Sequence, residues 1–464
     1  MKILYAASEA VPFCKTGGLA DVAGSLPPAL AEQGAETAVI LPLYRRVREK
    51  FADQLTFLCY DYVDLAWRHT YCGLFSMKKD GVTWYFLDNE QYFDRPELYG
   101  YVDDGERFGF FSRAVVKMLD HLEFWPDVIH CNDWQTALIP IYLKDDGVRE
   151  DRYRSIRTVL TIHNIEYQGR HDPYCLGDLF GLDRGWVDDG TLLLDGDLNL
   201  LKGAILTADA VNAVSPTYAQ ELKNPYFAHR MEGILTQCGY KLSGVLNGID
   251  MKLYDPAADG RITANYTAED LSGKAADKTA LQNLMGLNEE PNTPIIAMVS
   301  RLVSHKGLDL LREVMGDIME LPAQFVVLGS GDAGYEEFFR RTAERYPGRM
   351  AVRLGYNEAL SMAIYAGADL FLMPSRSEPC GLSQMISMRY GTVPIVRETG
   401  GLKDTVQPYE AWRDAGTGFT FANYSSADML HVIREAVYLY KDYPDAFARL
   451  RDRAMAQDFS WNRS

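Results

Sequence analysis

The sequence predicts an α/β protein made of two Rossmann-like domains, each built on a doubly wound parallel sheet. Short apolar runs that suit buried strands alternate with helical segments along the first half of the chain. The alternation stops at the polar stretch of residues 255–272 and then starts again. A chain of 464 residues is also too long for one ordinary domain. We therefore expect an N-terminal domain over residues 1–245 and a C-terminal domain over residues 246–464.

The first half opens on the apolar run of residues 2–7, which is expected to form a buried strand. Helical sequence follows over residues 19–33, and the proline pair at positions 27 and 28 is expected to kink or divide this helix. Residues 51–107 are richer in aromatic and charged side chains, and they indicate an antiparallel or loop-rich insertion. Further strands are expected at residues 37–41, 128–130, 159–162 and 210–214.

The strands of the second half are expected at residues 295–299, 325–328, 352–354, 370–373 and 394–396. Open parallel sheets bind ligands outside the carboxyl ends of their strands. We therefore expect the chemistry of both halves at these edges, and we expect the two edges to face each other across a deep cleft. Whether the last segment of the chain packs back on the N-terminal domain stays open at this point.

The composition excludes several classes of protein. A chain that is 47% hydrophobic and 24% charged is typical of a soluble globular protein. The formal charge of −17 disfavours partners such as nucleic acid or an anionic membrane, although a few local cations can still hold an anionic ligand. Seven cysteines without a Cys-x-x-Cys pair indicate reduced thiols in the cytoplasm. Glu9 interrupts the N-terminal apolar run, which indicates a strand rather than a signal peptide.

Two cations and one carboxylate follow neighbouring expected strands of the second half. Arg301 and Lys306 flank a strand-to-helix turn, where free amides and the helix dipole already favour anions. A guanidinium and an ammonium group together suit a diphosphate. Pro379 favours an extended backbone at Glu378, so this carboxylate can face sugar hydroxyls. A solvated basic turn and an ordinary capping glutamate are the alternatives.

The first strand-to-helix loop offers a third cation, Lys15, beside a glycine pair that includes Gly18. Glycine lets the backbone approach a ligand closely. Asp21 either caps the following helix or binds acceptor hydroxyls. His163 ends the strand expected at residues 159–162, and three roles stay open for it: a sugar contact, a general base and a purely structural histidine.

Residues 329–334 match the dinucleotide pattern G-x-G-x-x-G, between an expected strand and an expected helix. The acidic residue expected at the end of the next strand is absent, and Asp332 adds negative charge to the loop, so a nicotinamide enzyme is disfavoured. No group of His and Cys has metal-ligand spacing, and the sequence holds no G-x-S-x-G motif. We therefore expect neither a metal nor a cofactor.

Four longer motifs resemble those of bacterial glycogen synthases and plant starch synthases. They lie at residues 15–22 (KTGGLADV), 300–310, 374–382 (PSRSEPCGL) and 399–406 (TGGLKDTV). The likeness runs in register along almost the whole chain. It implies a GT-B fold and transfer of glucose from ADP-glucose to the non-reducing end of glycogen or another α-1,4-glucan, with release of ADP.

The resemblance also implies two sets of site residues. The catalytic set is Glu378, His163, Arg301 and Lys306. The substrate-binding set is Lys15, Gly18, Asp21, Asn164, Asp133, Tyr356, Gly381 and Leu382. In this scheme the cations hold the diphosphate, Glu378 holds the glucose, the amides of Gly381 and Leu382 meet the distal phosphate, and Tyr356 stacks on the base. Departures from the usual family residues occur at Gln135, His305, Ser383 and Ile386, and none of them removes a charged catalytic group.

The family retains the α-configuration of the donor. Double displacement would need a carboxylate nucleophile beneath the anomeric carbon, and the motifs offer only Glu378 as a strong candidate. Front-face attack, with the leaving phosphate accepting the proton of the acceptor, is therefore favoured. Three alternatives remain at this stage: a catalytically silent glucan-binding protein, a sucrose-synthase-like transferase and a nucleotide-sugar epimerase.

Overall fold

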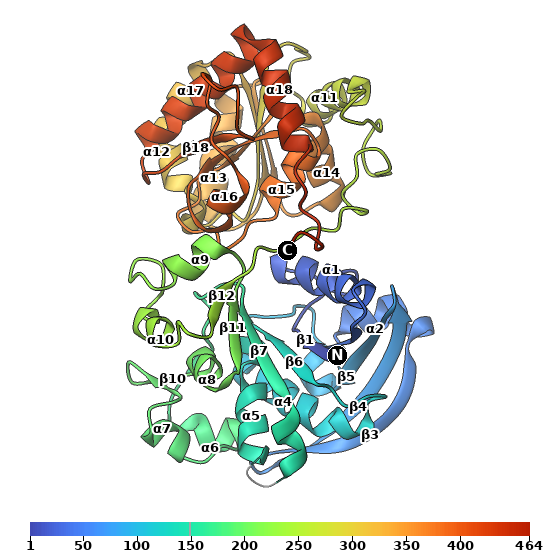
Figure 1. Ribbon diagram of the computed structural model, residues 1–464. Helices are drawn as coiled ribbons and strands as arrows, with labels where there is room; N and C mark the ends of the chain where they lie inside the picture. The colour runs from blue at the N-terminus through green and yellow to red at the C-terminus, as the bar shows by residue number, and fades with distance from the viewer. Residues whose placement is uncertain (148–149) are drawn as a thin grey trace. The chain divides into compact units, whose positions relative to one another are not determined.

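The computed structural model describes residues 1–147 and 150–464, which form two compact units, Met1–Val245 and Leu246–Ser464 (Figure 1). Each unit is a layered α/β structure, described by itself below. None of the helices in the described residues is both long and apolar enough to cross a membrane.

Unit 1 is built on a twisted sheet with helices on its faces (Figure 1). Its strands are β1 (Lys2–Ala6), β2 (Glu36–Pro42), β3 (Thr56–Leu65), β4 (Arg68–Lys79), β5 (Val82–Asp88), β6 (Val128–Asn132), β7 (Arg157–Ile162), β8 (Arg170–His171), β9 (Leu193–Leu194), β10 (Asp197–Asn199), β11 (Ala210–Ala213) and β12 (Leu242–Gly244). Within the described residues nine of them pair in the order β12-β11-β7-β6-β1-β2-β5-β4-β3, and a separate small sheet has the order β8-β10-β9.

The pairs from β12 through to β5 are parallel, whereas β4 and β3 are antiparallel additions at one edge. The expectation of an antiparallel or loop-rich insertion over residues 51–107 is therefore confirmed for β3 and β4, which extend the main sheet, whereas β5 lies in the same range and pairs parallel with β2. The helices of unit 1 are α1 (Gly18–Glu32), α2 (Arg45–Phe51), α3 (Glu90–Phe93), α4 (Asp104–Lys117), α5 (Leu138–Gly147), α6 (Cys175–Phe180), α7 (Gly185–Asp188), α8 (Leu200–Thr207), α9 (Pro216–Glu221) and α10 (Glu232–Gln237).

Helix α1 corrects one expectation. It runs without a break from Gly18 to Glu32, with Pro27 and Pro28 inside it, so of the two expectations, a kink or a division, the division is wrong and the kink stays a prediction. Two adjacent prolines remove only two neighbouring amide donors, and their fixed φ is compatible with a helix. The buried residues of α1 begin at Leu19 and extend up to and include Pro27, so packing of this face supports the helix into the proline pair.

Unit 2 holds a parallel sheet with the order β15-β14-β13-β16-β17-β18. These strands are β13 (Ile295–Val299), β14 (Gln324–Gly329), β15 (Met350–Leu354), β16 (Leu370–Met373), β17 (Val393–Arg397) and β18 (Phe419–Phe421). The helices around them are α11 (Ser272–Met285), α12 (Leu308–Glu320), α13 (Ala333–Arg345), α14 (Glu358–Gly367), α15 (Ser383–Arg389), α16 (Gly400–Thr405), α17 (Ser426–Asp442) and α18 (Pro444–Met455). All five strands expected in this half are present.

The structure explains the G-x-G-x-x-G pattern without a dinucleotide. A Cβ at Gly329 would lie 1.9 Å from the carbonyl oxygen of Ser300, and a Cβ at Gly331 would lie 2.4 Å from that of Leu302. Both glycines are therefore needed because the loop after β14 packs directly on the loop after β13.

Candidate active site

The predicted residues of unit 2 gather at the carboxyl edge of its sheet. Arg301 follows β13, Tyr356 lies just beyond β15, and Glu378 belongs to the loop after β16. Arg301 and Tyr356 are exposed, whereas Glu378 is only 7% exposed. The edge therefore combines one buried carboxylate with an exposed cation and an exposed ring.

Glu378 forms an ion pair with Lys306, 72 residues earlier in the chain. The Lys306 Nζ donates to both carboxylate oxygens, at 2.9 Å and 2.7 Å, and the Ser375 Oγ donates to one of them at 2.8 Å. The sequence suggested separate tasks for these two charges, diphosphate for Lys306 and sugar for Glu378. The structure places them in direct contact, so each fixes the position of the other.

Backbone packing brings this pair together. Strands β13 and β16 are neighbours in the sheet, so the loops that follow them start side by side. Gly307, at φ +75°, lies against the second loop, and a Cβ there would come within 2.1 Å of the Pro374 carbonyl oxygen. The amide N–H of Arg376 also donates to the carbonyl of His305 at 2.8 Å. Any side chain at position 307 would push the lysine loop away from the glutamate loop.

The T-G-G motif supports the glutamate from the other side. Gly400 has φ +44°, and a Cβ there would lie 2.0 Å from the Glu378 carbonyl oxygen. A Cβ at Gly401 would lie 2.1 Å from the carbonyl oxygen of Cys380, and the Gly401 N–H donates to the Glu378 carbonyl at 3.2 Å. The sequence singled out this motif without a task for it. Its task is to let α16 pack under the Glu378 backbone.

Glu378 is ionised in this setting. Burial alone would raise the pKa of Glu378, but attraction to Lys306 and the hydrogen bonds from Lys306 and Ser375 outweigh it and hold that pKa below its ordinary value. The residues that follow, Gly381 with φ +70° and Leu382, lead into α15, whose first amides have no partner within the helix. A fixed negative charge thus lies close to a set of backbone donors.

In unit 1 the backbone of His163 and Asn164 is held by a buried carboxylate, Asp133. Its Oδ1 accepts the N–H of His163 at 2.7 Å and that of Asn164 at 3.3 Å. Asp133 itself has φ +54°, an uncommon conformation for an aspartate, of the kind often found at functional sites. Burial raises the pKa of Asp133 to about 7, against the lowering effect of these hydrogen bonds, and the charge of Glu9 adds to the rise.

The hydrogen bonds around Asn132 fix the tautomer of His163. The Asn132 side-chain N–H donates to the Ala6 carbonyl at 3.0 Å, so its Oδ1 faces the Tyr5 hydroxyl at 2.8 Å and the His163 Nε2 at 2.9 Å. An amide oxygen only accepts, so His163 carries its proton on Nε2. Burial, with a smaller contribution from His130, lowers the pKa of His163 to about 3. A group this weakly basic is poorly suited to act as a general base near neutral pH, and a neutral hydrogen-bonding role fits better.

The lysine loop at the start of α1 depends on a residue to which sequence reasoning gave no site role, Glu9. It is buried, and its Oε2 accepts both the backbone N–H of Thr16 and the Thr16 hydroxyl, the latter at 2.8 Å. Burial raises the pKa of Glu9 to about 7 despite these bonds. Lys15 pairs with Asp21 at 2.7 Å, and Gly18 opens the helix. One signal was available in the sequence: a single carboxylate within an otherwise apolar run.

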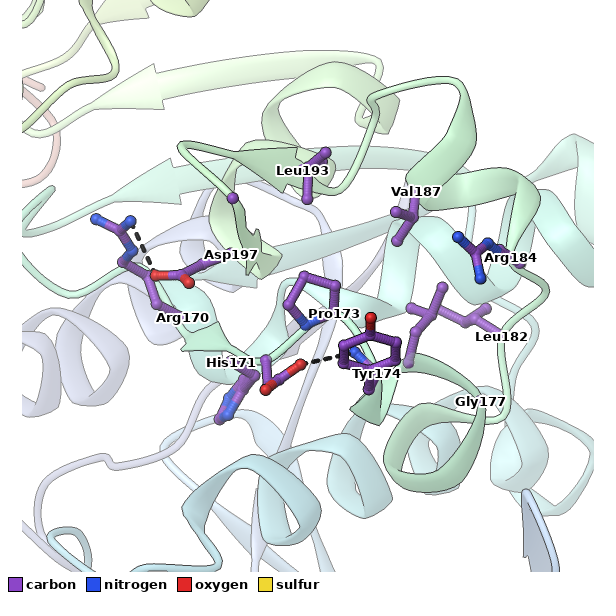
Figure 2. Close-up of a pocket in the computed structure, with 13 residues that line it drawn as sticks. Arg170, His171, Pro173, Tyr174, Gly177, Leu182, Arg184, Val187, Leu193 and Asp197 are labelled. Carbon is purple, nitrogen blue, oxygen red and sulfur yellow. Dashed lines mark hydrogen bonds and ion pairs between the residues drawn. The ribbon is translucent and has the colours of Figure 1, made fainter.

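A pocket of about 830 Å³ lies elsewhere in unit 1 and contains none of the predicted site residues (Figure 2). It is formed by the β8–α6 segment, α7 and the turn between β9 and β10. Among the described residues no group of three or more His, Cys, Asp or Glu side chains is arranged to hold a metal ion.

Comparison with known proteins places this geometry in a family. The profile of the starch synthase catalytic domain matches residues 2–237, and that of the group 1 glycosyl transferases matches residues 284–449. Glycogen synthase of Bacillus cereus is 47% identical over 464 residues, which cover 100% of this chain and 97% of that protein. This chain belongs to the glycogen synthase and starch synthase family. It is a glycosyltransferase of glucan synthesis. A second relative supports this assignment: glycogen synthase of Ligilactobacillus salivarius is 47% identical over 99% of this chain and 97% of that protein.

Solved structures agree as well. The catalytic domain of starch synthase IV from Arabidopsis thaliana, bound to ADP and acarbose, matches with a TM-score of 0.91 and 34% identity over 99% of this chain and 96% of that one. Sucrose-phosphate synthase from Thermosynechococcus elongatus shares the fold, with a TM-score of 0.61 and 17% identity. The match covers 100% of this chain and 96% of that one. The fold is GT-B, as the family resemblance implied.

Proposed function

We propose that this glycosyltransferase moves glucose from ADP-glucose to the non-reducing end of glycogen or a similar α-1,4-glucan, with retention of configuration and release of ADP. One observation carries the proposal. A buried, ionised Glu378 is held by Lys306 and Ser375 at the sheet edge that also presents Arg301. A starch synthase bound to ADP and acarbose has the same fold at 34% identity, which supports both the nucleotide and the glucan.

Each group has a stated task in this proposal. Arg301 and Lys306 neutralise the diphosphate as the bond to glucose breaks, and the amides around Gly381 accept the distal phosphate. Glu378 accepts hydrogen bonds from the transferred glucose. Lys15 is assigned to the same diphosphate on the strength of its family motif alone.

The way Glu378 is held bears on which of the two retaining mechanisms the enzyme uses. Its two oxygens already accept three hydrogen bonds from Lys306 and Ser375, which restrain it as an acceptor rather than present it as a nucleophile. We therefore favour front-face attack, in which the acceptor hydroxyl passes its proton to the leaving phosphate. The neutral His163, its backbone held by Asp133, contributes hydrogen bonding to the donor sugar with Asn164 and takes no proton.

The proposal also covers cofactors, the remaining substrate-binding residues and the location of the protein. The proposal requires neither a metal nor a cofactor, because the protein supplies the cations that a departing diphosphate needs. Tyr356, Gly18 and Asp21 are assigned to substrate binding by the family motifs. A cytoplasmic location fits seven cysteines that are all free thiols.

Donor competition tests the proposal. Purified protein is given ADP-glucose or UDP-glucose with glycogen, and released nucleotide and incorporated glucose are measured together. Equal amounts of ADP and incorporated glucose, with UDP-glucose used much less, are expected. Nucleotide release without incorporation would contradict transfer to glucan. No release at all would favour a silent glucan-binding protein, and transfer to fructose would favour a sucrose-synthase-like enzyme.

A further inference from the structure

One buried lysine of unit 2, Lys274, has no role in the proposed function. It lies in the first turn of α11 and is only 8% exposed. A lysine is almost never this buried unless it is paired. In the described part of the chain, however, the Lys274 Nζ donates to no carboxylate. Uncharged oxygens from the ends of two helices hold this ammonium group instead.

Four oxygens face the Lys274 Nζ. Two are the carbonyl oxygens of Ala366 and Ala368, at 2.8 Å and 2.9 Å, which belong to the last turn and the C-terminal cap of α14. The others are the carbonyl oxygen of Tyr390, at 2.9 Å, and the hydroxyl of Thr392, at 3.0 Å. Tyr390 caps the C-terminus of α15. The last carbonyls of a helix have no partner within it, and the helix dipole favours a cation there, so Lys274 joins the C-terminal ends of both helices.

The helix that carries Lys274 is fixed against α14 (Figure 1). A Cβ at Gly367 would lie 2.7 Å from the Asp277 carbonyl oxygen and 2.8 Å from the Leu281 Cβ, so α11 touches the last turn of α14. The Asp277 Oδ1 also accepts the N–H of Thr263 at 2.8 Å, which joins α11 to the segment before it. Position 274 is therefore a fixed point from which an ammonium group can hold other elements.

The contacts of Lys274 favour its charged form. Burial lowers the pKa of Lys274 to about 7, and the charge of Asp369 counteracts this fall. The Thr392 hydroxyl donates its own proton to the Tyr365 carbonyl at 2.6 Å, so it acts as an acceptor toward Lys274. All four oxygens are then acceptors, which suits an ammonium group with three N–H donors and no lone pair.

The opposite ends of the same two helices carry groups that the proposed function assigns to the nucleotide. Tyr356 lies two residues before α14, and Gly381 and Leu382 lie directly before α15. Helices of ten and seven residues are about 15 Å and 10 Å long, so Lys274 is too distant to touch the donor. A hydrogen-bonded helix is stiff along its axis, so a shift at its C-terminal end also moves its N-terminal end.

We propose that Lys274 is a positioning residue that sets the spacing between the Tyr356 ring and the amides of Gly381 and Leu382. Without the ammonium group, three carbonyl oxygens of like partial charge would face one another, and the C-terminal ends of α14 and α15 would move apart. Their N-terminal ends would move too and would no longer match the length of one nucleotide. The inference rests on the proposed function, because that function assigns both sets of contacts to ADP.

Lys274→Ala tests the inference, because it removes four heavy atoms that n-propylammonium can replace. Titration calorimetry with ADP measures binding, and initial rates at pH 7 measure use of ADP-glucose and glycogen. The Kd for ADP and the KM for ADP-glucose should rise about tenfold, less than the ~10²-fold that misplacing a group by about 1 Å can cost. The KM for glycogen should stay unchanged. Propylammonium should restore ADP binding at constant ionic strength, whereas 1-propanol, of the same size without charge, should not.

Lys202→Ala is the matched control. Lys202 is also 8% exposed, and its Nζ donates to the carbonyl oxygens of Gly190 and Leu193, both at 2.7 Å, within unit 1. Both variants should unfold at a lower temperature than the wild type, but only Lys274→Ala should bind ADP more weakly. Unchanged ADP binding in Lys274→Ala, an equal loss in Lys202→Ala, or no recovery with propylammonium would each overturn the inference.

Two further measurements keep the outcome decisive. Should Lys274→Ala fail to fold, Lys274→Met keeps the volume of the stem without the ammonium group and must show the same rise in the Kd for ADP. A wild-type protein that binds ADP but transfers no glucose would contradict the proposed function. The inference about Lys274 would then stand or fall on the Kd for ADP alone, which is measured without turnover.

Discussion

Removal of Lys306 should separate the structural and chemical tasks of the ion pair with Glu378. Lys306→Ala leaves a buried carboxylate with only Ser375 as a partner. The Lys306 and Glu378 side chains are 16% and 10% exposed, so water screens the pair little. Loss of one partner from such a pair costs about 3 kcal/mol, near the lower end of what buried pairs show. For a unit of this size the corresponding fall in Tm is about 6–12 °C.

The loss should depend on pH with a defined sign. In the wild type the folded pKa of Glu378 lies below its ordinary value, so the pair adds stability above the unfolded pKa of about 4.3 and loses it as the pH falls through the folded pKa. In the variant, burial acts without Lys306 and raises the folded pKa, so the carboxyl group becomes neutral on acidification. The stability difference between the two proteins should therefore be largest at pH 7–8 and shrink on acidification to about pH 4.

Calorimetry at several pH values and rates of ADP release measure the two effects. Lys278→Ala is the matched control, because Lys278 forms a buried ion pair with Asp369 at 2.9 Å in the same unit without contact to Glu378. Both variants should lose stability, but only Lys306→Ala should lose about 10²–10³-fold in activity. Glu378→Gln added to Lys306→Ala should restore stability and not activity. A Lys306→Ala protein as stable as the wild type at pH 8, or as active as Lys278→Ala, would refute the reasoning.

Three further outcomes are expected. Lys15→Gln and Glu9→Gln should each raise the KM for ADP-glucose about tenfold or more, because Glu9 holds the loop that carries Lys15. The KM for glycogen should change little in both variants. Equal changes in the two KM values in initial-rate assays would contradict the assignment of Lys15 to the donor. Asp133→Asn keeps an oxygen for the two amides and removes a carboxyl group whose folded pKa is about 7. Calorimetry should show that the stability of the wild type relative to this variant falls by about 2–4 kcal/mol as the pH rises from 4 through 7. A stability difference that does not change with pH would exclude the raised pKa of Asp133. Chelator should leave ADP release largely intact, because Arg301 and Lys306 supply the positive charge, whereas inhibition reversed by Mg²⁺ or Mn²⁺ would contradict the metal-free mechanism.

Local sequence was sufficient for the strands and for the loops that carry charge. The apolar runs at residues 295–299 and 370–373 fall within two residues of β13 and β16, because a strand buried on both faces has to be apolar along its length. It follows that Arg301 and Glu378, directly beyond such runs, belong to the same edge. The failure at Pro27-Pro28 has the opposite origin, because burial of a helix face outweighed a local rule.

By itself the sequence determined the fold class, the division of the chain, and which charged residues stand at the carboxyl ends of strands, since these depend on periodicity and on neighbours along the chain. The tertiary structure alone decided which of those charges meet. The Lys306–Glu378 pair spans 72 residues and depends on a glycine at position 307 that lets two loops touch. The neutral tautomer of His163 depends on an asparagine in another strand, and the lysine loop depends on the buried Glu9. Hydrogen bonds, burial and pKa shifts are set by distances through space, which spacing along a chain does not encode.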